Sequence, residues 1–201
     1  MRKIVLQSGD ALIIVDVQND FMPGGSLAVK HGDEVIAPLN HYIALFQEDG
    51  LPIYAIRDWH PANHCSFTSQ GGVWPPHCVQ QSHGAEFAEA LHLPPQTKII
   101  STATHTDLDA YSGFQGTTLN AQLKKARIRR LFIAGLATDY CVLNTVKDAL
   151  ALLYQVYVLN NAIRAVDVQP GDGERAIAEM HGLGAEFIEM AELEWIAAAI
   201  C

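Results

Sequence analysis

Short runs of aliphatic and β-branched residues recur along the chain, and each run is apolar at nearly every position instead of alternating with polar residues. Continuous apolar runs of this length are typical of parallel strands, because a parallel sheet is covered on both faces. The pattern therefore predicts a mainly parallel sheet of about six strands, at 11–16, 52–58, 97–102, 130–135, 156–160 and 185–189.

The stretches between these runs carry the spacing of amphipathic helices. In the first of them Asp33 can cap a helix and Gly50 can end it, whereas Pro38 is compatible with a helix only in its first turn. Strands that alternate with helices predict an α/β protein, a three-layer α/β/α sandwich that forms a single domain over 1–201. The predicted helices lie at 33–49, 117–127, 139–154, 172–182 and 191–199.

The composition narrows the class of protein. The net charge of −9 argues against nucleic acid or an anionic membrane as a partner. No apolar run is long enough to cross a bilayer, and the first run is short and contains Asp16, so we expect neither a membrane span nor a secretory leader. The four cysteines are irregularly spaced, which favours reduced thiols and a cytoplasmic protein.

Reactive side chains follow the predicted strands. In parallel α/β sheets, ligands gather beyond the carboxyl ends of the strands. Asp16 closes the first run, Asp58 and His60 close the second, and Cys141 follows the fourth. The run 97–102 is an exception, because it ends in a serine and a threonine. The pattern predicts a functional site at this edge of the sheet.

Cys141 stands where a strand gives way to a helix. Thr138 or Asp139 as N-cap would place it in the first helical turn, where free amides and the helix dipole stabilise a thiolate and can hold an oxyanion. Taken alone, a structural cysteine in a core is an equally good interpretation. That interpretation is kept for the other three, Cys65, Cys78 and Cys201.

Asp16 is a candidate proton acceptor for such a thiol, since no histidine stands at a strand end for that purpose. A carboxyl group buried after an apolar strand is expected to have a raised pKa, which suits proton transfer. A turn or cap aspartate is the alternative, with equal weight at this point.

Asp58, His60 and His77 form a candidate metal site. The first two are two residues apart in an extended run, so both side chains can reach one ion, and His77 comes from a proline-stiffened loop. Nitrogen and oxygen ligands suit one divalent transition metal, and the sequence does not separate zinc, iron and manganese. His64 is a possible further ligand that is equally compatible with a supporting or exposed position.

Several motifs together resemble the nicotinamidase family, a branch of the isochorismatase-like cysteine hydrolases. They are "LIIVDVQNDFMPGGSL", "RDWHPANHCSF", "WPPHCV", "DAYSGF" and "GLATDYCV", and the resemblance covers nearly the whole chain. It implies an isochorismatase-like fold and the hydrolysis of nicotinamide to nicotinate and ammonia, a step of NAD salvage, with pyrazinamide as a further substrate.

The resemblance also implies roles for individual residues. Cys141 would be the nucleophile, Asp16 the proton shuttle, and the amides of Ala137 and Cys141 an oxyanion hole next to a cis Leu136–Ala137 bond. The metal held by the candidate triad would meet the pyridine nitrogen. The walls of the ring pocket would be Phe21, Leu27, Trp74 and Tyr111.

One position departs from the family. A lysine is expected at the end of the third strand, where it would pair with the aspartate and the thiolate, but Thr102 occupies the aligned position and carries no charge. Lys98 lies four residues upstream, about 13 Å along a strand, which is too far to replace it. The chain is therefore expected either to turn over slowly or to bind a ligand without processing it.

Two further alternatives stay open at this point. Another amidohydrolase of the superfamily would share Cys141 and Asp16 but would not need the metal triad. A nucleotide-binding flavodoxin-like domain is disfavoured, since the first strand–helix turn lacks a glycine-rich phosphate motif. The sequence leaves open whether the protein forms a homo-oligomer.

Overall fold

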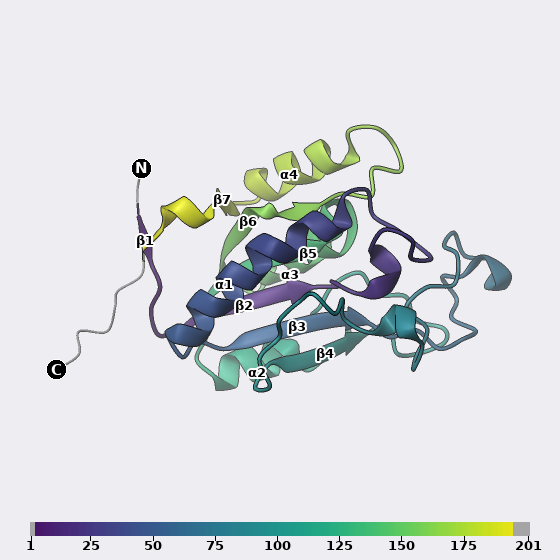
Figure 1. The fold of residues 1–201 in the computed structure, drawn as a ribbon, viewed down its shortest axis with the longest axis horizontal. Helices are drawn as coiled ribbons and strands as arrows, with labels where there is room; N and C mark the ends of the chain where they lie inside the picture. Colours follow the sequence, from purple (N-terminus) through teal and green to yellow (C-terminus); the bar gives the residue numbers. More distant parts are fainter. Residues whose placement is uncertain (1–2, 195–201) are drawn as a thin grey trace.

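The computed structural model describes residues 3–194. Its centre is a sheet of six strands, all paired in parallel, in the order β4-β3-β2-β5-β6-β7 (Figure 1). This confirms the predicted mainly parallel sheet and α/β fold class. The strands are β2 (Asp10–Val15), β3 (Ile53–Asp58), β4 (Lys98–Thr102), β5 (Arg130–Leu136), β6 (Gln155–Arg164) and β7 (Glu186–Ile188).

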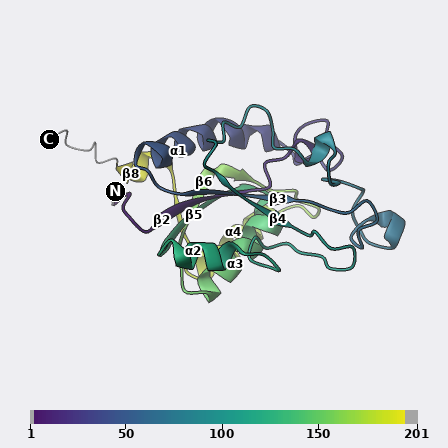
Figure 2. The same ribbon diagram turned by 90° about the horizontal axis from the view of Figure 1, so that it is seen from below.

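Helices cover both faces of the sheet, which gives the three predicted layers. Helix α1 lies on one side and α2, α3 and α4 lie on the other (Figure 2). Their bounds are α1 (Ile36–Glu48), α2 (Leu119–Lys125), α3 (Leu143–Ala151) and α4 (Asp172–Gly182). Among the described residues, no helix is long and apolar enough to span a membrane.

The two cores explain why the strands are apolar throughout. Successive side chains of a strand point to opposite faces. In β2, Leu12 and Ile14 pack in the core under α1, whereas Ala11, Ile13 and Val15 pack in the core under the other helices. Every residue of β2 is buried, so an alternating polar pattern would place polar groups in one of the cores.

Most helix predictions hold, with local differences. The helix predicted at 33–49 begins as a 3-10 turn, Gly32–Val35, and Pro38 falls in the first turn of α1, where its missing N–H costs nothing. The helix predicted at 191–199 is wrong for 191–194: a 3-10 turn, Met190–Glu192, is followed by the short strand β8 (Leu193–Glu194), which pairs in parallel with β1 (Ile4–Val5). A capping box between Glu189 and Glu192 satisfies the N-terminal amides of this turn, and the chain then extends to pair with β1. The rest of that prediction lies outside the described residues.

Two backbone features shape the carboxyl edge of the sheet. Asp16 turns out of β2 with a left-handed φ of 49° and is 2% exposed. Beside it, a Cβ at Gly135 would overlap the carbonyl oxygen of Val15, so only glycine lets β5 pass β2 at this point. The first part of the connection 59–97 between β3 and β4 extends beyond the same edge, and its last part returns beside α1 (Figure 1).

Candidate active site

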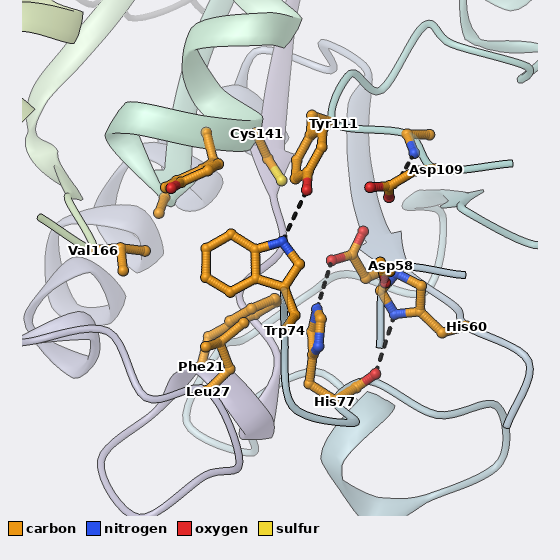
Figure 3. Close-up of a pocket in the computed structure, with 14 residues that line it drawn as sticks. Phe21, Leu27, Asp58, His60, Trp74, His77, Asp109, Tyr111, Cys141 and Val166 are labelled. Carbon is orange, nitrogen blue, oxygen red and sulfur yellow. Dashed lines mark hydrogen bonds and ion pairs between the residues drawn. The ribbon is translucent and has the colours of Figure 1, made fainter. Parts of the chain in front are cut away.

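A pocket opens at this edge of the sheet, and Figure 3 shows the side chains around it. The structure brings most of the predicted site residues to this one cavity. Its lining includes Cys141 and Ala137, the three candidate metal ligands Asp58, His60 and His77, and the predicted ring walls Phe21, Leu27, Trp74 and Tyr111. Asp16 and Thr102 are buried and are not part of the lining.

Cys141 lies in a π-helical turn, Thr138–Val142, which leads from β5 into α3. The Leu136–Ala137 peptide bond before this turn is cis, as the resemblance implies. The predicted helix-start position of Cys141 is confirmed, but the predicted N-cap is wrong, because Ala137 is the N-cap and no side chain caps the turn. The Asp139 carboxylate instead accepts hydrogen bonds from the amides of Val166 and Asp167, at 2.9 and 2.8 Å, and ties the turn to the loop after β6.

The Cys141 thiol and the Asp16 carboxyl group lie within 4.8 Å of each other. Burial raises the pKa of Asp16 well above its usual range, and the charge of Asp58 raises it further. The raised pKa predicted for Asp16 is thereby confirmed. A carboxyl group in this state can accept a proton from the thiol and return it.

The expectation of a lowered thiol pKa is wrong. Burial raises the pKa of the Cys141 thiol well above its usual range, and the carboxylates of Asp16 and Asp58 add to this. Desolvation and two negative neighbours therefore outweigh the amides of the helical turn. In this pair the thiol holds its proton more tightly than usual, and the neighbouring carboxylate is a stronger base than usual.

Asp58, His60 and His77 converge as a metal triad, with their ligand atoms all within 4.8 Å of one another. The Nδ1 of His60 lies 3.1 Å from the His77 carbonyl oxygen, and the Nδ1 of His77 lies 2.8 Å from that of Pro75. Each ring therefore donates through Nδ1 and keeps its Nε2 lone pair free for a cation.

The electrostatics of the triad fit a bound cation. Burial lowers the pKa of His60 to about 4 and also lowers that of His77, so both rings are in the neutral form that coordinates metal. Burial raises the pKa of Asp58, as expected for a carboxylate that lacks a counter-charge. Two imidazole nitrogens and one carboxylate oxygen suit a divalent transition metal.

Aromatic side chains form the opposite wall of the pocket (Figure 3). The Trp74 indole N–H donates to the Tyr111 hydroxyl at 2.8 Å. The rings of Trp74 and Tyr140 meet edge to face, with centroids 5.1 Å apart. Phe21 packs against the ring of His77 at 5.7 Å and so links the aromatic wall to the metal triad. The arrangement fits a small flat ring with a metal-binding atom.

Comparison with known proteins agrees with this geometry. The isochorismatase domain family matches residues 10–192 of the chain. The nicotinamidase of Escherichia coli (strain K12) is 40% identical, over 92% of this chain and 96% of its own length.

The chain belongs to the isochorismatase family, in its nicotinamidase branch.

Solved structures of the same family confirm the predicted fold. The pyrazinamidase of Pyrococcus horikoshii in complex with zinc has 48% identity and a TM-score of 0.87, over 90% of this chain and 99% of that one. A protein from L. infantum in complex with nicotinate has 35% identity and a TM-score of 0.87, over 96% and 100% of the two chains.

Five pocket residues were not found by sequence reasoning: Ser66, Asp109, Ala110, Tyr140 and Val166. All but Val166 lie inside the motifs quoted above, so position within a motif was the available signal for them. The side chain of Tyr140 reaches the pocket from a π-helical turn, which a regular helical spacing does not anticipate. Val166 comes from the loop held by Asp139, and no local pattern marks it.

His64 is buried beside the candidate metal triad, with its ring centroid 4.5 Å from that of His60. Its Nδ1 lies 2.7 Å from the Ser66 hydroxyl and its Nε2 lies 3.2 Å from the Leu108 carbonyl oxygen. Both ring nitrogens are thus engaged within the protein. These contacts fit a supporting position, while His60, His64 and Asp109 also form a group that could hold a cation, so the role of His64 stays open.

Thr102, aligned with the lysine expected in this family, ends β4 opposite Asp58 in the strand register. It is 3% exposed, and its hydroxyl oxygen lies 3.1 Å from the Asp58 Oδ1. Among residues 3–194, the Asp16 Oδ1 is buried without any hydrogen-bond partner. Lys98 donates to the Tyr54 hydroxyl at the other end of β4, so it does not replace the missing charge.

Proposed function

We propose that this protein is a nicotinamidase that hydrolyses nicotinamide to nicotinate and ammonia through a thioester on Cys141. One observation carries the proposal. A thiol–carboxyl pair and three metal-ligand side chains converge on one aromatic-walled pocket. A ureido or carbamoyl hydrolase would need the first set alone, whereas a pyridine carboxamide offers each set a partner.

The substrate ring is held between Phe21, Leu27, Trp74 and Tyr111, with its amide toward Cys141. A divalent transition metal bound by Asp58, His60 and His77 supplies a Lewis acid for the ring nitrogen, and zinc, iron and manganese all suit these ligands. The aromatic wall excludes water from the amide until ammonia has left.

The first half of the reaction forms the thioester. The Cys141 sulfur attacks the amide carbon as its proton passes to Asp16, and the Ala137 and Cys141 amides hold the oxyanion. Asp16 then gives the proton to the leaving nitrogen, the carbon–nitrogen bond breaks, and ammonia departs.

The second half returns the enzyme to its resting state. Asp16 takes a proton from a water molecule, whose oxygen attacks the thioester carbon. The carbon–sulfur bond breaks, the proton returns to the sulfur, and the acid loses its own proton to solvent and leaves as nicotinate. Pyrazinamide also carries a carboxamide with a ring nitrogen in the meta position, and it is the second proposed substrate. The proposal places the reaction in NAD salvage in the cytoplasm.

Ammonia release from the purified, metal-supplemented protein tests this function. Nicotinamide is expected to release ammonia, whereas benzamide, which lacks the ring nitrogen, is expected to release far less. Cys141→Ala is expected to abolish release while the protein stays folded and binds metal.

Thr102 favours a second candidate, a metal-bearing protein that binds nicotinamide without hydrolysing it. Nicotinamide binding without ammonia release would support this candidate and contradict the enzyme. Release by the Cys141→Ala variant at the wild-type rate would contradict the assigned nucleophile.

A further inference from the structure

The main chain at Asp58 is held in place by a buried glutamine side chain. Its backbone amide donates to the Gln18 Oε1 at 2.8 Å, and its carbonyl oxygen accepts from the Gln18 Nε2 at 2.8 Å. Gln18 is fully buried and is itself anchored to the Ala85 carbonyl oxygen. The main chain at the end of β3 is thus clamped, and the carboxylate direction depends on its own contacts.

The two oxygens of the Asp58 carboxylate face different partners. Oδ1 lies 3.1 Å from the Thr102 hydroxyl on the neighbouring strand. Oδ2 lies 3.8 Å from the His77 Nε2, the nitrogen left free for a cation. A hydrogen bond to Oδ1 therefore turns Oδ2 toward the centre of the triad.

The Thr102 hydroxyl has one proton and two acceptors at equal distance, Asp58 Oδ1 and the Arg57 carbonyl oxygen, both at 3.1 Å. A carboxylate is the stronger acceptor, because hydrogen bonds to a charged oxygen are roughly twice as strong as neutral ones. The bond to Asp58 is buried, so water does not compete for it. The proton therefore belongs with Asp58.

Thr102 also contrasts with the residue expected in its place. A lysine would pair with Asp16 on the thiol side of the pocket, whereas the short threonine hydroxyl reaches only the metal side. The Asp16 Oδ1 correspondingly has no hydrogen-bond partner in the part of the chain that the structure describes. With threonine at this position, the hydrogen bond goes to Asp58 and not to Asp16.

We propose that Thr102 is a positioning residue for the metal, whose hydroxyl holds Asp58 Oδ1 and aims Oδ2 at the cation site. The proposal rests on the metal triad of the proposed function, but not on the occurrence of amide hydrolysis. Groups that orient a metal ligand in this way typically contribute about 10- to 100-fold to metal affinity.

The test is the equilibrium affinity of the purified protein for zinc, measured by chelator competition. Thr102→Val removes the hydroxyl and keeps the β-branched shape, and it is expected to weaken zinc binding about 10- to 100-fold. Thr102→Ser keeps the hydroxyl and is expected to stay close to the wild type. The matched control is Thr104→Val, the same change at an exposed position two residues on, which is expected to have no effect.

Two results would overturn the proposal: zinc affinity of Thr102→Val equal to that of the wild type, or equal losses in the Val and Ser variants. The second would assign the effect to packing. If Thr102→Val does not fold, Thr102→Ala provides the same comparison with Thr102→Ser. Without added metal, Thr102→Val is expected to have a lower unfolding midpoint than Thr102→Ser, because the buried Asp58 Oδ1 loses its donor, so zinc affinities are compared at a temperature where all variants are folded.

Kinetics separate this inference from the proposed function. At limiting zinc, Thr102→Val is expected to raise KM for nicotinamide more than it lowers kcat, and excess zinc is expected to restore much of the loss. Weakened zinc binding in a protein that releases no ammonia would support the role of Thr102 and contradict the nicotinamidase. Ammonia release with zinc affinity insensitive to the hydroxyl would do the reverse.

Discussion

The two sides of the pocket differ in how completely their polar atoms are supported. On the metal side, His60 and His77 each use Nδ1 on a backbone carbonyl, and Asp58 uses Oδ1 on Thr102. On the thiol side, one oxygen of Asp16 has no hydrogen-bond partner within residues 3–194. The side chains of the candidate metal triad are thus held by the protein itself, whereas Asp16 next to the Cys141 thiol has an oxygen without a donor.

The largest effect is expected from Asp16→Asn, which keeps the shape of the side chain and removes its proton chemistry. Turnover is expected to fall about 10²- to 10⁴-fold, the usual contribution of general acid–base catalysis. Zinc affinity, measured by chelator competition, is expected to change little. A variant that turns over nicotinamide like the wild type would remove Asp16 from the mechanism.

His77→Ala tests the other side of the pocket. Loss of one of three ligands is expected to weaken zinc binding at least about 100-fold, since even residues that only orient a ligand contribute up to this amount. Metal analysis after dialysis and KM for nicotinamide are the measurements, with KM expected to rise. Full zinc occupancy with unchanged KM would contradict the assigned triad.

Thr102→Lys is expected to reverse the imbalance between the sides. A cation near Asp16 and Cys141 lowers both raised pKa values, and one to two pKa units correspond to about 10- to 100-fold in turnover. Zinc affinity is expected to fall in the same variant, because the hydroxyl on Asp58 is lost. A lysine variant slower than the wild type at saturating zinc would contradict the view that the thiol side lacks charge.

The pH dependence of turnover follows from the direction of the Asp16 shift. Only the ionised carboxylate can accept the thiol proton, so activity rises with pH as Asp16 loses its proton. Because burial raises the pKa of Asp16, this rise is expected well above the usual carboxyl range of about 4. Thr102→Lys is expected to move it to lower pH, and a pH–rate profile of kcat/KM for both proteins checks the direction.

The smallest effect concerns a second unsupported oxygen, outside the pocket. The Thr97 hydroxyl is buried without a hydrogen-bond partner in the described part of the chain. Replacement by valine removes the unmet hydroxyl, so Thr97→Val is expected to be neutral or to stabilise the fold by up to about 1 kcal/mol. Chemical denaturation measures it. A clear loss of stability would show that the Thr97 hydroxyl does make a stabilising hydrogen bond.

Much of this fold could be predicted from the sequence because its strands are buried on both faces. Continuous apolar runs such as the one in β2 have no other ready explanation, and they place Asp16 and Cys141 at one edge. The two-residue spacing of Asp58 and His60 was enough to predict that their side chains lie on the same side of the strand. The aromatic wall was predicted from the family resemblance, because no local sequence pattern indicates it.

Other features depend on contacts between distant segments. The π-helical turn that presents Tyr140 has no simple period in the sequence. The Cys141 pKa was predicted from its own helix, whereas burial and the neighbouring carboxylates determine it. The partner of Thr102 follows from the register of β3 and β4. At 191–194 the sequence has helical spacing, but residues 193 and 194 form β8 because they pair with β1, which is distant in the sequence.

The central claim is that Cys141 and Asp16 perform covalent chemistry on a ring held by the metal triad. Mass spectrometry of zinc-loaded protein, acid-quenched during turnover of nicotinamide, tests it most directly. We expect a nicotinoyl group on the peptide that contains Cys141, and none on the peptides that contain Cys65 or Cys78. Turnover without any adduct on Cys141, unchanged in Cys141→Ala, would contradict the account.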